Sequence, residues 1–203
     1  MQTLFYFHDP MCSWCWGYRP TWLKLLELLP SSIHLEYIVG GLAPDSDQVM
    51  STDMANSIQT HWRRIELELG TLFNYDFWVE CEPRRSTYPA CRAVIASKLQ
   101  HAEQAMILAI QKAYYLQAKN PSNFDLLVAI AADLNLDIKR FKKDIASVQT
   151  EAALTEQVNF SRKLKVPGFP SLVLKNGASN YPIEVNYQDA LVTCNQIMKY
   201  IEL

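Results

Sequence analysis

The feature that most constrains this 203-residue chain is the tetrapeptide Cys12-Ser13-Trp14-Cys15. The aromatic, aliphatic and β-branched run at residues 3–7 is typical of a buried strand, and residues 8–10 interrupt it. A helix is predicted from Ser13 to just before Pro30. The two cysteines are therefore expected at a turn that joins the end of a strand to the start of a helix.

The position of Cys12 at the start of this helix predicts its chemistry. Unpaired backbone N–H groups and the positive end of the helix dipole point at a side chain in that position, and both favour a thiolate. Cys15 lies one turn further on and is expected to be more shielded. Because exchange needs one thiolate that attacks and a second thiol that resolves the mixed disulfide, we assign attack to Cys12 and resolution to Cys15.

Two cysteines at this spacing are also compatible with half of a zinc site or with an inert pair. A zinc site takes two more ligands, usually a second close pair. The four histidines form no pair at metal spacing, and the other cysteines are scattered, so we expect redox chemistry and no metal. The other cysteines are predicted to be free thiols, with one structural disulfide as the alternative: Cys81, Cys91 and Cys194.

A second feature follows more than 150 residues later, where Phe169-Pro170 comes directly before the apolar run at residues 171–174. Only bonds that precede proline adopt the cis form at appreciable frequency. We predict a cis bond here, which turns the backbone N–H and C=O of Phe169 outward toward an extended substrate. The alternative is an ordinary trans-proline at the start of a strand.

Segments 9–17 and 166–171, which contain these two features, resemble the DsbA-like family of disulfide oxidoreductases within the thioredoxin superfamily. The resemblance covers nearly the whole chain. It implies Cys12 as nucleophile, Cys15 as resolving thiol and Pro170 as the cis-proline. It also implies an α/β, thioredoxin-like fold with an inserted all-helical subdomain.

The chain departs from the periplasmic members of that family at two places. Those proteins carry a histidine between the cysteines and a buried acidic residue six positions before the first cysteine. Here Ser13 and Trp14 separate the cysteines, and Tyr6 takes the other position. We therefore expect an intermediate or reducing potential rather than a strongly oxidising one, on a scale where thioredoxin lies near about −270 mV and DsbA near about −120 mV.

Helical patterns fill the middle of the chain. We predict a thioredoxin-like domain from residues 1–44 and 150–203, with a helical subdomain inserted at 45–149. Strands at 33–39, 171–174 and 181–185, with Asn176-Gly177 as the hairpin signal, complete a mixed sheet with helices on both faces.

Several further residues are candidates for the site. Trp14, Ser13 and Phe169 are expected to support substrate binding. Asp9 either positions a water or accepts a proton near Cys15, or it caps a turn. His8 either influences the thiolate or is a plain strand-end histidine. Arg84-Arg85 is expected to be solvated. A group of aromatic residues is expected in the core of the helical subdomain, and the alternative is that these residues line a substrate groove: Trp62, Phe73, Tyr75, Phe77 and Trp78.

Composition sets the remaining limits. A net charge of −2 gives no electrostatic reason to expect nucleic-acid binding, and no apolar run approaches the ~20 residues that span a bilayer. The first strand begins almost at Met1 and leaves no room for a secretory signal, so a cytoplasmic location is expected.

The predicted function is that of an enzyme, a thiol–disulfide oxidoreductase or protein disulfide isomerase. It acts on protein or small-molecule thiols and disulfides, needs no cofactor, and relies on a redox partner, with glutathione as a candidate reductant. One alternative is a glutathione-dependent enzyme related to kappa-class glutathione transferases and 2-hydroxychromene-2-carboxylate isomerases. These typically use a serine near the position of Cys12, so the intact pair argues against it. The second alternative is a non-catalytic peptide-binding chaperone module.

Overall fold

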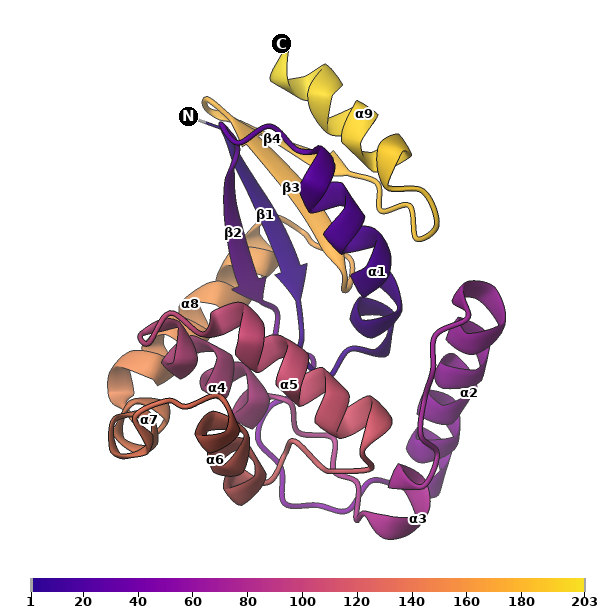
Figure 1. The fold of residues 1–203 in the computed structure, drawn as a ribbon, viewed down its shortest axis with the longest axis vertical. Coiled ribbons are helices and arrows are strands. Elements are labelled where there is room, and N and C mark those ends of the chain that lie inside the picture. The colour runs from indigo at the N-terminus through magenta and orange to yellow at the C-terminus, as the bar shows by residue number, and fades with distance from the viewer. Residues whose placement is uncertain (1, 203) are drawn as a thin grey trace.

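The computed structural model describes residues 2–202, and its centre is a four-stranded sheet in the order β2-β1-β3-β4 (Figure 1). The central strand β1 (Thr3–His8) pairs in parallel with β2 (His34–Val39) and antiparallel with β3 (Ser171–Asn176). A hairpin joins β3 to β4 (Ser179–Ile183). The mixed sheet predicted from the sequence is therefore confirmed.

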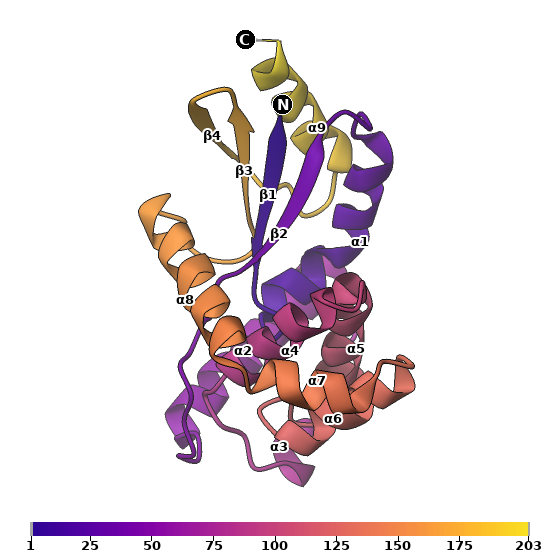
Figure 2. The ribbon, with the colours of Figure 1, turned by 90° about the vertical axis from the view of Figure 1, so that its left-hand side faces the viewer.

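Side chains of β1 alternate between two apolar layers. Leu4 and Tyr6 face the layer of α1 (Ser13–Leu28) and α9 (Ala190–Ile201), whereas Phe5 and Phe7 belong to the layer of α8 (Val148–Lys163). The ring centroids of Phe5 and Phe160, which lies on α8, are 5.1 Å apart in an edge-to-face arrangement. Figure 2 shows α8 on one face of the sheet and α1 with α9 on the other. Burial on both faces explains why residues 4–7 of β1 are all aliphatic or aromatic.

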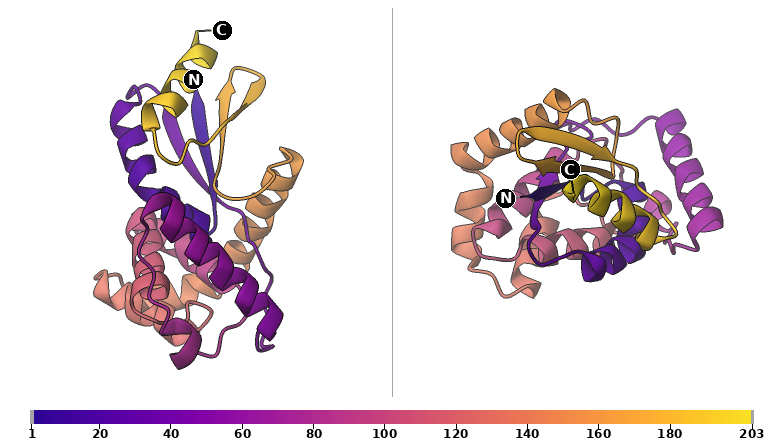
Figure 3. Two further views of the ribbon diagram at one scale, coloured as in Figure 1. Left: turned by 90° about the vertical axis from the view of Figure 1, so that its right-hand side faces the viewer. Right: turned by 90° about the horizontal axis from the view of Figure 1, so that it is seen from above.

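Between β2 and α8 the chain forms a group of helices at one end of the sheet (Figure 3). The first of them, α2 (Thr52–Leu69), is capped by the Ser51 hydroxyl, which accepts from the Met54 N–H, and ends at Gly70 in the left-handed conformation. The others are α3 (Phe77–Glu80), α4 (Tyr88–Lys98), α5 (Glu103–Leu116), α6 (Phe124–Asp133) and α7 (Ile138–Ile145).

The aromatic residues of this helical region form a core of their own. Trp62 on α2 and Phe77 on α3 are fully buried against Tyr114 and Tyr115 of α5. The predicted core role of this group is confirmed. Met11 and Trp16, beside the cysteine pair, pack against the same cluster. The helical region is therefore in direct contact with the turn that carries the cysteines.

Two details differ from the sequence prediction. The short α3 was not expected, because four residues carry no helical periodicity. In the hairpin, Asn176 pairs with Ser179, so β4 starts two residues earlier than predicted and the loop is 177–178. Gly177, with φ of +60°, takes the first loop position, where a type II′ turn requires positive φ.

The predicted boundaries of the inserted helical subdomain, at residues 45 and 149, remain a prediction. Within residues 2–202 no helix combines the length and apolarity needed to cross a membrane.

Candidate active site

Cys12 is the N-cap of α1, at the end of the sheet that faces the helical region. Its Sγ accepts a hydrogen bond from the backbone N–H of Cys15 at 3.4 Å. The same sulfur donates to the carbonyl oxygen of Phe169 at 3.2 Å. The two predicted halves of the site, 157 residues apart in sequence, therefore meet at one sulfur atom.

Phe169 is held against a glycine of the loop that follows β2. The Phe169–Pro170 peptide bond is cis. A Cβ atom added at Gly40 would lie 1.8 Å from Cζ of the Phe169 ring, far inside any real contact distance. The ring therefore occupies the space that a side chain at position 40 would fill, and this packing fixes where the Phe169 carbonyl meets Cys12.

Cys12 opens onto a groove of about 240 Å³. The groove also contains Ser13, Trp14 and Phe169, so four of the predicted site residues line one surface. Trp14 is oriented by two neighbours, because the Arg64 guanidinium lies 5.3 Å from its ring centroid and Tyr187 packs edge-on at 5.2 Å.

The same groove contains three basic side chains that sequence reasoning did not assign to the site, namely His61, Arg84 and Arg85. The expectation that Arg84-Arg85 is merely solvated is incomplete, since both residues line the groove and Arg84 also donates to Asn123. Nothing in the local pattern identifies them, because the loop before α4 is brought to the groove by packing of the helical region.

Asp9 is completely buried and has hydrogen-bond partners on both oxygens. Oδ1 accepts from the Met11 N–H at 2.8 Å, and Oδ2 accepts from the Leu42 N–H at 2.8 Å and the Thr87 hydroxyl at 2.7 Å. The Cys91 thiol is a further donor to Oδ2 at 3.6 Å. Burial raises the pKa of Asp9, and these donors oppose the rise. The geometry favours the turn-capping role, in which Asp9 joins the cysteine turn to the loops after β2 and before α4.

We expect Asp9→Asn to lower the free energy of unfolding by about 1–3 kcal/mol, because an amide NH₂ would face backbone donors in either orientation. The measurement is urea denaturation, with the exposed Asp133→Asn as the matched control. A carboxyl with a raised folded-state pKa contributes stability that is present below its unfolded pKa and lost as pH rises through its folded pKa. The difference in the free energy of unfolding between wild type and Asp9→Asn should therefore become smaller as pH rises. A difference that does not depend on pH would contradict this account.

Cys15 and His8 lie on another side of the cysteine turn. Cys15 is only 1% exposed, and burial, followed by its interaction with Cys12, raises its pKa well above the usual value. His8 is also 1% exposed, and burial lowers its pKa to about 3. Both residues line a small cavity rather than the groove at Cys12. His8 thus shares its cavity with Cys15 and not with Cys12, whose thiolate one of its two sequence interpretations required it to influence.

The remaining cysteines are unpaired, and each is engaged locally. The Cys81 thiol donates to the Ala118 carbonyl, and the Cys194 thiol donates to the Leu28 carbonyl. Among residues 2–202 no three side chains of the metal-binding types are grouped as ligands.

The fold and the cysteine turn define a thioredoxin-like protein. The sequence model of the family described as Thioredoxin matches residues 5–196, and the chain belongs to this family. Among solved structures it is similar to a candidate protein disulfide isomerase from Nitrosomonas europaea, with a TM-score of 0.87, 24% identity and coverage of 99% of this chain and 98% of that one. It is also similar to the cytosolic disulfide reductase DsbM from Pseudomonas aeruginosa, with a TM-score of 0.75, 21% identity and coverage of 98% and 97%.

Curated relatives carry a different description. The chain is 25% identical over 179 residues to the ClpXP adapter protein SpxH of Halalkalibacterium halodurans, covering 85% of this chain and 58% of the relative. It is 27% identical over 203 residues to SpxH of Bacillus cereus, covering 93% of this chain and 68% of the relative. The chain therefore spans about three-fifths to two-thirds of the length of these relatives.

Proposed function

We propose that this protein is a thiol–disulfide oxidoreductase in which Cys12 attacks and Cys15 resolves. The observation that carries the proposal is the placement of Cys12 Sγ, which accepts a helix N-terminal N–H and opens onto the groove while Cys15 is buried one turn away. A Cys12 thiolate attacks a substrate disulfide and releases one thiolate. The Cys15 sulfur then attacks Cys12 Sγ, and the second substrate sulfur leaves.

The test of this function is the reduction potential of the Cys12–Cys15 couple. The protein is equilibrated with glutathione redox buffers, and its free thiols are trapped and counted by mass. We expect a reversible two-electron couple with an intermediate or reducing potential, because Ser13 and Trp14 supply no charge between the cysteines. The absence of any reversible couple between these two residues would disprove the proposal.

Glutathione is our proposed reductant, and the cytoplasm, where glutathione keeps thiols reduced, our proposed location. The basic side chains His61, Arg84 and Arg85 border the groove that contains Cys12. Glutathione carries two carboxylates, whose negative charge the Arg84 and Arg85 guanidinium groups complement. The DsbM protein of Pseudomonas aeruginosa, which has a similar fold, has been solved with GSH, and this supports glutathione as the reductant proposed here.

We expect Arg85→Gln to slow the reaction of the oxidised protein with glutathione by a factor of about 2–5, because an exposed charge interaction is worth at most about 1 kcal/mol. The reaction with uncharged 2-mercaptoethanol should not change. Rates are measured by stopped-flow fluorescence at low and high salt, with Arg63→Gln, an exposed arginine outside the groove, as the matched control. Equal slowing with both thiols would contradict recognition of the carboxylates.

A second candidate function is non-catalytic binding of a protein partner. It is favoured by the SpxH relatives, which are described as ClpXP adapter proteins and align with most of this chain. Replacing both Cys12 and Cys15 with serine separates the two functions. An adapter would keep its binding, whereas an oxidoreductase would lose its exchange activity. The same variant tests the transferase alternative, since enzymes of that class typically use a serine near position 12.

A further inference from the structure

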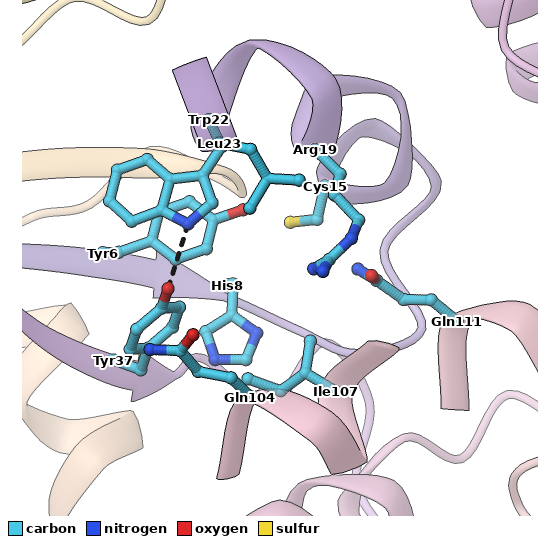
Figure 4. Close-up of a pocket in the computed structure, with 10 residues that line it drawn as sticks. All are labelled: Tyr6, His8, Cys15, Arg19, Trp22, Leu23, Tyr37, Gln104, Ile107 and Gln111. Atoms are coloured by element: carbon cyan, nitrogen blue, oxygen red, sulfur yellow. Dashed lines mark hydrogen bonds between the residues drawn. The ribbon is translucent and has the colours of Figure 1, made fainter. Parts of the chain in front are cut away.

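A small polar cavity lies beside the resolving thiol and shares no lining residue with the groove at Cys12. Figure 4 shows its walls: His8 comes from β1, Cys15 and Arg19 from α1, and Gln111 from α5. The volume open to a water-sized sphere is about 20 Å³. Since about 10–15 Å³ of such volume holds one water, the cavity has room for a single molecule.

Two side chains in this cavity present buried polar atoms that the rest of residues 2–202 leaves without hydrogen-bond partners. They are both ring nitrogens of His8 and Oε1 of Gln111. The two side chains are only 1% and 3% exposed. Unpartnered buried polar atoms cost stability, and a water needs two to four polar partners. The cavity therefore offers a water both the space and the bonding groups that it needs.

Resolution of a mixed disulfide requires that Cys15 lose its proton. Around the cavity, burial raises the pKa of Tyr6 and Tyr37, which remain protonated, and the Arg19 guanidinium is permanently protonated. Cys12 is occupied by the substrate at this step. His8 is neutral, and its low pKa makes it an acceptor of hydrogen bonds rather than a base.

Outside the cavity lining, the titratable groups that act on Cys15 or on its neighbours are also unsuited to take the proton. The donors at Met11, Leu42 and Thr87 stabilise the Asp9 carboxylate and oppose the rise in its pKa, so Asp9 is a weak base for a thiol whose own pKa is raised well above its usual value. Burial raises the pKa of Tyr115 and of Tyr187, so both hydroxyls keep their protons. We therefore take solvent as the destination of the Cys15 proton.

We propose that His8 and Gln111 hold a water against Cys15, and that this water carries the Cys15 proton to solvent during resolution. This inference rests on the proposed function. The Sγ–H bond of Cys15 breaks, the water takes that proton and passes one of its own to a solvent base, and the Cys15 electron pair forms the bond to Cys12 Sγ. The bond between Cys12 and the substrate sulfur breaks, and the substrate leaves as a thiolate that takes a proton from solvent.

The route to solvent and the electrostatics fit this role. Gln104 and Leu23, which also line the cavity, are exposed, so the cavity reaches the surface. Arg19 follows Cys15 by one helical turn and therefore lies on the same face of α1. In Figure 4 its guanidinium points into the cavity toward the amide of Gln111. A positive charge on this wall stabilises a thiolate at Cys15 as it forms.

The test compares His8→Phe with wild type in single-turnover oxidation by glutathione disulfide, quenched in acid and resolved by mass. Phenylalanine keeps the ring that stacks on Tyr6, at 5.4 Å between centroids, and removes both nitrogens. We expect resolution of the Cys12–glutathione mixed disulfide to slow by at least about tenfold, on the scale of positioned proton transfer. The Tm should change little, because removal of a buried polar ring offsets the loss of its hydrogen bond to the water. Attack by Cys12, measured alone in a Cys15→Ser background, should not change.

Two further variants complete the test. Gln111→Leu should also slow resolution, and His8→Gln, which restores a polar acceptor, should recover most of the rate. Wild-type resolution rates in both His8→Phe and Gln111→Leu would overturn the proposal, as would slow resolution accompanied by a large fall in Tm, which indicates a structural role. If wild type itself forms no Cys12–Cys15 disulfide, the proposed function fails instead.

Discussion

Cys12→Ser is expected to lose thiol–disulfide exchange by a factor on the order of 10³ or more, the scale on which an enzyme loses activity with its covalent nucleophile. The groove, Phe169 and the helix N-terminus all remain in this variant, but a serine hydroxyl is not ionised at neutral pH and cannot attack a disulfide. The measurement is reduction of a small disulfide and of a scrambled protein under multiple turnover.

Two matched variants make this result specific. Cys15→Ser should keep the attack and accumulate a mixed disulfide at Cys12, which intact mass detects. Cys194→Ser changes another buried thiol, one whose nearest acceptor is the Leu28 carbonyl, and should keep full activity. Exchange activity that survives Cys12→Ser would assign the nucleophile to another residue.

The second large effect is expected at Gly40, a position with no reactive group. The added methyl group of Gly40→Ala would lie 1.8–2.4 Å from three atoms of the Phe169 ring, so the ring must move. Overpacking of this kind costs about 1–3 kcal/mol. Because the Phe169 carbonyl accepts from Cys12 Sγ, a displaced ring also disturbs the substrate side of the site. The free energy of unfolding, measured by denaturation, and the rate of thiol–disulfide exchange should both decrease.

Gly168→Ala is the matched control, since a Cβ at that glycine meets no atom within 4 Å. It should change neither stability nor exchange. Phe169→Leu removes the ring atoms that meet the new methyl group, so Gly40→Ala should cost much less in that background. Equal costs in both backgrounds would show that the penalty arises elsewhere.

The parts of the site that the sequence could predict are those set by local rules. The strand, the interrupting turn and the helix around residues 12–15 follow from apolar patterning and from the placement of Pro10 and Pro30. The apolar run after Pro170 likewise indicates a strand. Position at a helix N-terminus is a local property, so the environment of Cys12 could be inferred before its neighbours were placed.

The parts that could not be predicted depend on contacts between distant segments. Nothing around Gly40 indicates that Phe169 will pack on it, and nothing around Arg85 indicates a groove. For Asp9 the sequence left a proton-transfer role and a capping role open, and only the donors at Leu42 and Thr87 separate them. The cavity at Cys15 is lined by residues of β1, α1, β2 and α5, so no single motif encodes it.

The order of strands in the sheet has a consequence for the newly made chain. β1 can pair with β2 once residue 39 has been synthesised, but its other neighbour includes Leu174, the partner of Leu4. The ribosome adds about 5–20 residues per second, and roughly 135 residues separate β2 from β3. The second edge of β1 therefore lacks its partner strand for on the order of ten seconds. During this interval Cys12 lacks the Phe169 carbonyl, and Cys81 and Cys91 are synthesised before that contact can form. A nascent chain is therefore itself exposed to disulfide exchange before its own site is assembled.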